Sequence, residues 1–146
     1  MQTYFQFLAT YACSIFSGAA LYVSLVEHPA RMSCGVVLAI TEWVPSYKRA
    51  AIMQASLAIL GSVFAFLAWN FGANILWLIG GFIFILVVPY TLIVMMPTNK
   101  GLLSPDLDKS AESTYQLLKK WNRLHLVRVL LSSIALIIFL FNINQV

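Results

Sequence analysis

The chain has 146 residues, of which 61% are hydrophobic and 10% are charged. A soluble domain carries about 25% charged residues, so the composition excludes an ordinary water-facing surface and indicates an integral membrane protein within the lipid bilayer. The net charge of +4 comes mostly from predicted loops and requires no nucleic-acid partner. Cys13 and Cys34 fall in a predicted span and a predicted loop, so we expect two reduced thiols.

Long charge-free segments predict four membrane-spanning helices. A bilayer core about 30 Å thick takes roughly 20 apolar residues in a helix. No charge occurs in 1–26, in 50–99 or after Arg128, and a polar turn at 70–74 divides the second segment. The predicted spans are about 4–26, 50–69, 75–96 and 124–143. We therefore predict an all-α fold, a single domain over 1–146 in which two antiparallel helical hairpins form an integral membrane four-helix bundle.

The distribution of Lys and Arg predicts the orientation of these spans. The predicted loop 27–49 holds three such residues and the loop 97–123 holds five, whereas the opposite side has none. Lys and Arg are enriched in cytoplasmic loops. We therefore expect both loops to be cytoplasmic and both termini exoplasmic, in a bacterial inner (plasma) membrane. The pattern leaves the oligomeric state open.

Polar and small residues form stripes on the first two spans. On a helical wheel one stripe of the first span comprises Ser14, Ser17, Leu21, Ser24 and His28, and one of the second comprises Gln54, Ala58, Gly61, Ala65 and Ala68. Small and hydroxyl side chains allow membrane helices to approach closely, so helix packing is a sufficient explanation for both. Between these spans, the mostly apolar segment 30–44 is expected to form a short helix in the interface.

The third and fourth spans have their own helix signals. Pro89 is expected to bend the third span, because proline lacks an N–H and crowds the carbonyl four residues earlier. The sequence Ser104-Pro105-Asp106 is typical of a helix start. From about Ser110 the chain can run helically to Phe141, and this length exceeds the bilayer, so the first turns are expected to stand in the cytoplasm.

Polar residues gather where the predicted spans meet the cytoplasmic boundary. They are Glu27, His28 and Arg31 on the first span, Asn99 after the third, and Trp121, His125, Arg128 and Ser132 on one face of the fourth. Ionisable groups at membrane depth usually face the protein interior, and a shared His28–His125 site is one hypothesis. The alternatives are that Arg128 snorkels to the headgroups, that Trp121 is an interfacial anchor, and that each histidine is structural.

Metal and ion chemistry have weaker support in the sequence. Glu27 and the two histidines, His28 and His125, are three potential ligands, but no two of these types share a helix at ligand spacing. We therefore predict neither a metal site nor a cofactor. A quinone- or haem-linked redox subunit is a further hypothesis, which predicts visible absorbance. The charge-free second and third spans give no acidic ring for an ion channel.

Six segments carry a family resemblance. They are 17–20 (SGAA), 27–31 (EHPAR), 47–50 (YKRA) with Gln54, 89–92 (PYTL), 96–100 (MPTNK) and 121–128 (WNRLHLVR). In order and spacing, over about residues 15–140, they resemble the anthrone oxygenase-like family of small membrane proteins. The resemblance implies a four-helix membrane fold. It also implies, for some members, oxidation of an anthrone to an anthraquinone by dioxygen with no established cofactor.

The resemblance suggests roles for the gathered residues. His28 or His125, whose ordinary pKa lies near 6.5, is expected to act as the base that removes an acidic C–H proton. Arg31, Arg128 and Asn99 are expected to stabilise the developing oxyanion. Trp121, with Tyr47 and Gln54 from the resembling segments, is expected to bind a lipophilic aromatic molecule. The competing hypothesis is a non-enzymatic bundle that binds a lipophilic ligand or a membrane-protein partner.

Overall fold

The computed structural model describes residues 1–143, and over that range its regular structure is entirely helical. Four helical runs, each long and apolar enough to cross a membrane, make up the chain. Their bounds are Gln2–Ser33, Val36–Asn70, Ile75–Leu102 and Glu112–Asn142. The predicted all-α fold of four membrane-spanning helices is thus confirmed, and the protein is a multi-pass membrane protein. Residues 144–146 of the predicted domain lie outside the described residues.

Two of these runs are interrupted and two are single α-helices. The first consists of α1 (Gln2–Tyr22), the π-helical turn η1 (Val23–Glu27) and α2 (His28–Ser33). The second is α3 (Val36–Asn70) throughout. The third consists of α4 (Ile75–Ile85), α5 (Val87–Tyr90), the π-helical turn η2 (Thr91–Met95) and α6 (Met96–Leu102), and the fourth is α7 (Glu112–Asn142).

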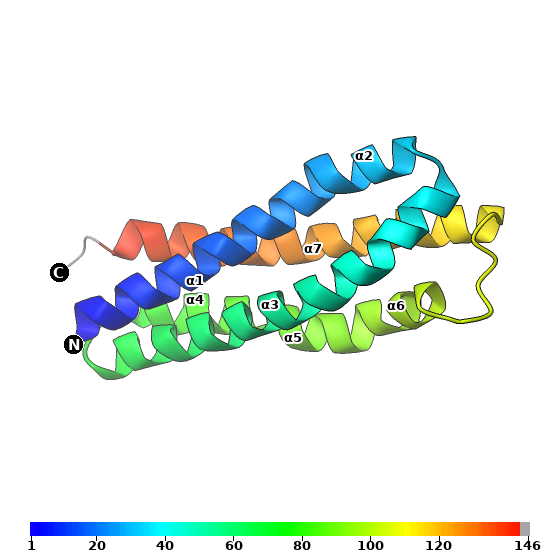
Figure 1. Cartoon of the computed structure of the whole chain (residues 1–146). Coiled ribbons are helices and arrows are strands. Elements are labelled where there is room, and N and C mark those ends of the chain that lie inside the picture. Colours follow the sequence, from blue (N-terminus) through cyan, green and yellow to red (C-terminus); the bar gives the residue numbers. More distant parts are fainter. Residues whose placement is uncertain (144–146) are drawn as a thin grey trace.

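The runs pack as two antiparallel hairpins in a four-membered ring. α1 packs against α3 and α7, and α4 packs against the same two helices. The start of α1 and the end of α7 lie at one end of the bundle, and the α2–α3 and α6–α7 connections lie at the other (Figure 1). We call the latter the loop end. At 35 residues, α3 is about 50 Å long, which exceeds a bilayer core of about 30 Å.

The half of the bundle near the termini is an apolar core. Phe16 meets Phe84 edge to face at a centroid distance of 5.3 Å, and Trp77 stacks on Phe139 at 4.9 Å. The predicted stripe of α3 is confirmed, because all five of its members are buried. Gly61 shows why they are small, since a Cβ there would lie 2.7 Å from the Phe84 ring.

The predicted first loop is wrong, because helices continue through most of it. α2 extends the first run to Ser33, and α3 already begins at Val36. Only a tight turn separates them, in which Gly35 adopts φ +91°, a conformation that suits glycine. The expected separate interfacial helix is therefore the first part of α3, and Pro45 lies within it.

The predicted helix start at Ser104-Pro105-Asp106 is also wrong. These residues lie in the connection between α6 and α7, and α7 begins at Glu112. The Asp108 carboxylate accepts hydrogen bonds from the Ser110 backbone at 2.9 Å and hydroxyl at 2.7 Å, and these bonds lower the pKa of Asp108. The Asp108 turn therefore precedes the helix. The expected helix from about Ser110 to Phe141 agrees closely with the observed bounds.

Prolines account for the irregular turns. η1 ends two residues before Pro29, and η2 ends two residues before Pro97. A wider turn accommodates the missing N–H and the ring of a proline that follows. The distortion expected at Pro89 takes the form of a break at Leu86, between α4 and α5.

The π turn η1 also changes which residues of the first run face inward. Ser17, Ser24 and His28 are buried as the stripe predicted, but Ser14 and Leu21 are exposed. A π turn advances through less rotation per residue than an α turn. On an ideal α-helical wheel, His28 lies on the same side as the exposed Leu21. The smaller rotation through η1 instead directs His28 toward the bundle interior.

The structure offers a direct test of the predicted orientation. Cys34 is exposed at the loop end, whereas Cys13 is buried in the bundle. A membrane-impermeant thiol reagent is therefore expected to label the protein once, at Cys34, from the cytoplasmic side. Inverted membrane vesicles should be labelled and intact spheroplasts should not, with Cys34→Ser as the control. Labelling of intact spheroplasts at Cys34 would reverse the orientation.

Candidate functional site

The predicted site residues come together at the loop end of the bundle. Seven of the eight are buried and Tyr47 is partly buried. The buried residues are His28, Arg31, Gln54, Asn99, Trp121, His125 and Arg128. They come from four elements, α2, α3, α6 and α7. The chain thus brings residues that are far apart in sequence into one interior region.

Aromatic rings form the wall of this region. The Trp121 ring lies 4.8 Å from the His125 ring, nearly parallel to it, and 5.6 Å from the His28 ring. Trp43 meets Trp121 edge to face at 5.6 Å and stacks on Tyr47 at 4.7 Å. Trp121 is therefore an interior residue that connects both histidines, and the interfacial-anchor alternative is wrong.

His125 is oriented by a hydrogen bond from another helical run. Its Nδ1 lies 2.8 Å from the hydroxyl oxygen of Ser24, which belongs to η1. The bond occupies Nδ1 and leaves Nε2 as the second ring nitrogen. When Nδ1–H donates to Ser24, Nε2 carries the lone pair and can accept a proton.

Arg128 points into the bundle and does not snorkel. Only 8% of its surface is exposed, and its Nη2 donates to Gln54 Oε1 at 2.7 Å. The guanidinium carbon lies 5.3 Å from the centre of the Phe16 ring, at cation–π distance. A buried cation of this kind is tolerated where polar groups and aromatic faces surround it.

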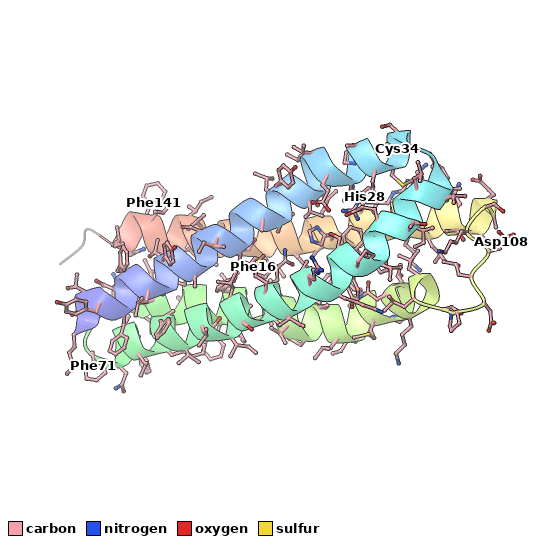
Figure 2. The ribbon with its side chains drawn as sticks, in the orientation of Figure 1. Phe16, His28, Cys34, Phe71, Asp108 and Phe141 are labelled. Atoms are coloured by element: carbon pink, nitrogen blue, oxygen red, sulfur yellow. The ribbon has the colours of Figure 1, made fainter. Side chains whose placement is uncertain are left out.

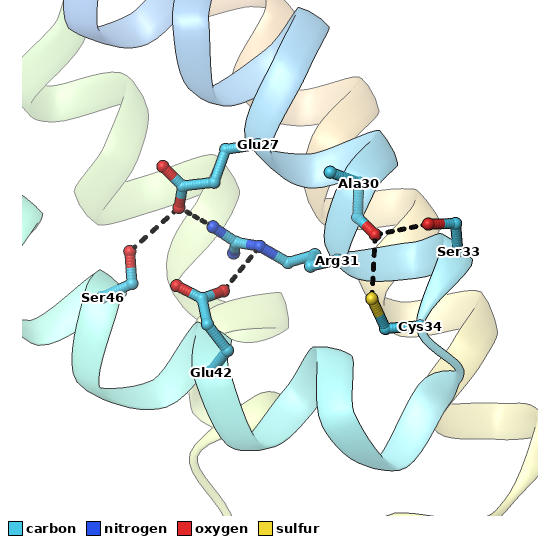
Figure 3. A network of polar contacts seen from close by, with 7 residues as sticks. All are labelled: Glu27, Ala30, Arg31, Ser33, Cys34, Glu42 and Ser46. Atoms are coloured by element: carbon cyan, nitrogen blue, oxygen red, sulfur yellow. Dashed lines mark hydrogen bonds and ion pairs between the residues drawn. The ribbon is translucent and has the colours of Figure 1, made fainter.

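Arg31 is held by two carboxylates at the same end. It pairs with Glu27 one turn earlier, and its Nε lies 2.7 Å from Glu42 Oε2 on α3 (Figure 3). Ser46 donates to Glu27 Oε1 at 3.2 Å. This network, which we call the Arg31 clamp, comprises Glu27, Arg31, Glu42 and Ser46. It ties the first run to α3 next to His28, which Figure 2 shows between Phe16 and Cys34.

Several buried polar atoms of the region have no hydrogen-bond partner among the described residues. They are His28 Nδ1, Trp43 Nε1, Asn99 Oδ1 and Nδ2, Trp121 Nε1 and Arg128 Nε. The Asn99 amide lies near the Tyr47 hydroxyl without a hydrogen bond of ordinary geometry. Buried polar groups are usually satisfied by protein, water or ligand. A concentration of them beside one aromatic wall therefore indicates a place where a polar ligand group binds.

Two adjoining cavities occupy this region. The larger, which we call the slot, has a volume of about 190 Å³. It is lined by Tyr47, Ala51, Gln54, Ala55, Ala58, Val87, Val88, Thr91, Leu92, Met96 and Arg128. The smaller, of about 30 Å³, is lined among others by Trp43, Trp121 and His125. Both include Tyr47, Gln54 and Arg128 in their walls, so the slot meets the small cavity at these side chains.

Some residues of the region were not predicted as part of the site. Ser24 shares the predicted stripe with His28, and that stripe is the available signal for its contact with His125. The charge pattern places Glu42 and Trp43 in a predicted loop and gives no signal for their positions on α3 next to Arg31 and Trp121. Among residues 1–143, no group of three or more His, Cys, Asp or Glu side chains is arranged to hold a metal ion.

Comparison with known proteins identifies a family. The model of the family described as anthrone oxygenase matches residues 43–138, about two thirds of the chain. The matched range includes Tyr47, Gln54, Asn99, Trp121, His125 and Arg128. It begins after His28 and Arg31, so these two residues are not covered. No curated protein and no solved structure matched the chain.

Proposed function

Because this chain belongs to the anthrone oxygenase family, we propose that it oxidises a lipophilic aromatic substrate of the anthrone type with dioxygen. One observation carries the proposal. His125 and Arg128, one turn apart on α7, both line the small cavity beside the Trp121 ring. A base and a cation beside a flat aromatic wall suit the removal of a proton from an aromatic ketone. The bilayer is the natural source of such a substrate.

The proposed reaction balances with dioxygen as the sole oxidant. A base takes one proton from the CH₂ group between the two aromatic rings, and the resulting anion passes one electron to dioxygen. The carbon radical and superoxide then form a C–O bond, and the peroxide takes the proton back from the base. Loss of the second C–H proton breaks the O–O bond, giving a carbonyl group and water. Anthrone and dioxygen thus yield anthraquinone and one molecule of water.

His125 is the better supported of the two candidate bases. It lines the small cavity, whose volume of about 30 Å³ suits a water molecule and not the substrate, and its Nδ1 is held by Ser24. We therefore assign to His125 the acceptance of the proton through such a water from a substrate in the adjoining slot. His28 is not part of the cavity wall but contacts the same Trp121 ring. We assign to His28 the support of the Trp121 ring.

Arg128 and Asn99 are the proposed oxyanion-stabilising groups. Proton removal moves negative charge onto the substrate oxygen, and preorganised donors in a water-poor site stabilise such charge strongly. Arg128 Nε and Asn99 Nδ2 are buried donors without a partner among the described residues. Arg128 lines both cavities and Asn99 lines neither, so Arg128 is the better supported of the two. Arg31 already pairs with Glu27 and Glu42, so we now assign it to holding α2 against α3.

The test is turnover by the purified protein in lipid nanodiscs. With anthrone as substrate, we expect anthraquinone formation and dioxygen uptake in a one-to-one ratio, well above the rate with empty nanodiscs, which measures autoxidation. Turnover equal to that of empty nanodiscs, for anthrone and for hydroxylated anthrones, would reject the proposal.

A non-enzymatic bundle that binds a lipophilic ligand is the second candidate. The slot and the unpartnered polar atoms support ligand binding as strongly as they support catalysis. A protein that only binds a ligand also needs a cavity and polar groups within it. Saturable binding of anthraquinone without any oxidation of anthrone would support this candidate over the first.

A further inference from the structure

The residues that line the slot are exposed at one end, which we call the mouth, and buried at the other, which we call the floor. Ala55 on α3 and Leu92 on η2 are exposed on the outer surface of the bundle, whereas Ala58, Val87 and Arg128 are buried. In a membrane-spanning bundle the outer surface at these apolar positions faces lipid. The mouth of the slot therefore opens sideways, between α3 and the segment formed by α5 and η2.

The sequence leaves room for this opening on both sides. On α3, Ala51, Ala55 and Ala58 follow one another at the helical spacing i, i+4 and i+7, and none extends beyond a methyl group. On the third run, the break at Leu86 before Pro89 interrupts the helix beside the slot. The slot therefore lies between small side chains on α3 and an interruption in the helix of the third run.

The floor of the slot is polar although its walls are apolar. Arg128 and Gln54 are more than nine-tenths buried and hydrogen-bonded to each other at 2.7 Å. Arg128 Nε has no partner among the described residues, and a buried N–H of a cation is a strong donor for an oxygen acceptor. The floor therefore selects a ligand with an oxygen at one edge.

The small cavity behind the floor is too narrow to be the ligand's route. Its volume of about 30 Å³ is close to the share of one water molecule in liquid water. Dioxygen, water or a proton fits through such a space, but a fused-ring molecule does not. The mouth of the slot is therefore the passage that suits a large apolar molecule.

We propose that a flat, apolar molecule with a carbonyl or phenolate oxygen enters the slot sideways from the hydrocarbon layer, between α3 and the α5–η2 segment. It stops when that oxygen meets Arg128 Nε, with its ring system against Ala55, Ala58 and Val87. This inference rests on the proposed function for the choice of ring system. The site itself is defined by the slot and by Arg128.

Retention of anthraquinone on protein-containing nanodiscs, relative to empty nanodiscs of the same lipid, measures binding independently of turnover. Ala55→Trp places an indole in the mouth and is expected to weaken binding about tenfold or more. Met53→Trp and Ile59→Trp are matched controls, because both residues are exposed on α3 and lie outside the slot lining. The controls should bind like the wild type. If a folded Ala55→Trp protein binds anthraquinone as tightly as the wild type does, the proposed mouth is wrong.

A pair of ligands tests the oxygen contact. Anthracene has the same three rings as anthraquinone but no oxygen, so the wild type is expected to prefer anthraquinone by about tenfold, as one charge-assisted hydrogen bond allows. The paired substitution Arg128→Met with Gln54→Leu removes both partners of a buried hydrogen bond and should abolish the preference. Equal binding of the two ligands by the wild type would overturn the role of Arg128.

These outcomes separate the inference from the proposed function. A protein that binds anthraquinone in the slot but does not oxidise anthrone keeps the inference and rejects the enzyme. A protein that oxidises anthrone at an unchanged rate with Ala55→Trp keeps the enzyme and rejects the lateral mouth.

Discussion

Replacing His125 by Asn is expected to lower the rate of anthrone oxidation about 100- to 10,000-fold, the range usually lost with a general base, while the protein stays folded. The Asn side chain places an amide near the position of the histidine Nδ1. It can therefore keep a hydrogen bond to the Ser24 hydroxyl, which lies 2.8 Å from Nδ1. It cannot accept a proton. The measurements are the initial rate above autoxidation and the melting temperature in the same detergent.

Two further variants show whether the effect belongs to the base. Ser24→Ala removes the hydrogen bond that orients His125 and should lower the rate less than His125→Asn, with a changed pH–rate profile. His28→Asn should have the smaller effect of the two histidine variants, because His28 does not line the cavity. Unchanged turnover in both histidine variants would reject the assignment. A strongly lowered melting temperature for His125→Asn would instead favour a structural network.

Much of the bundle followed from hydrophobic length and spacing. The α3 stripe of Gln54, Ala58, Gly61, Ala65 and Ala68 is buried throughout. The face of α7 that carries Trp121, His125, Arg128 and Ser132 is buried as well. Both stripes lie on uninterrupted α-helix, where the 3.6-residue period holds over the whole length. For such helices one sequence is enough to identify the inward face.

The connections are harder to predict, because a charged segment between apolar spans resembles a loop. Glu27, Arg31 and Glu42 are charged, yet all three lie on helices. Arg31 pairs with Glu27 one turn earlier in its own run and with Glu42 across the α2–α3 hairpin. Such pairing depends on tertiary contacts and has no periodic signal. The burial of His28 depends in the same way on η1, a π turn that helical-wheel reasoning does not include.

The Arg31 clamp gives the second large expected effect. Arg31→Met is expected to lower the free energy of unfolding by about 2 kcal/mol. Removal of one partner from a buried ion pair costs about 3–5 kcal/mol. The value here is reduced because the side chains of Glu27 and Glu42 are 28% and 48% exposed and water screens such charges. The loss arises because two carboxylates then face each other between α2 and α3 without a cation. Unfolding in detergent, followed by circular dichroism, measures the change.

A triple variant separates the clamp from a catalytic role for Arg31. Adding Glu27→Gln and Glu42→Gln to Arg31→Met removes the uncompensated charges, and neutral side chains of similar volume often replace an ion pair at little cost. The triple variant should therefore recover most of the stability and, if Arg31 only holds the helices, most of the turnover. A stable but inactive triple variant would show that Arg31 helps to stabilise the oxyanion. In that case the positive charge itself, and not the packing of α2 on α3, would be what the reaction requires.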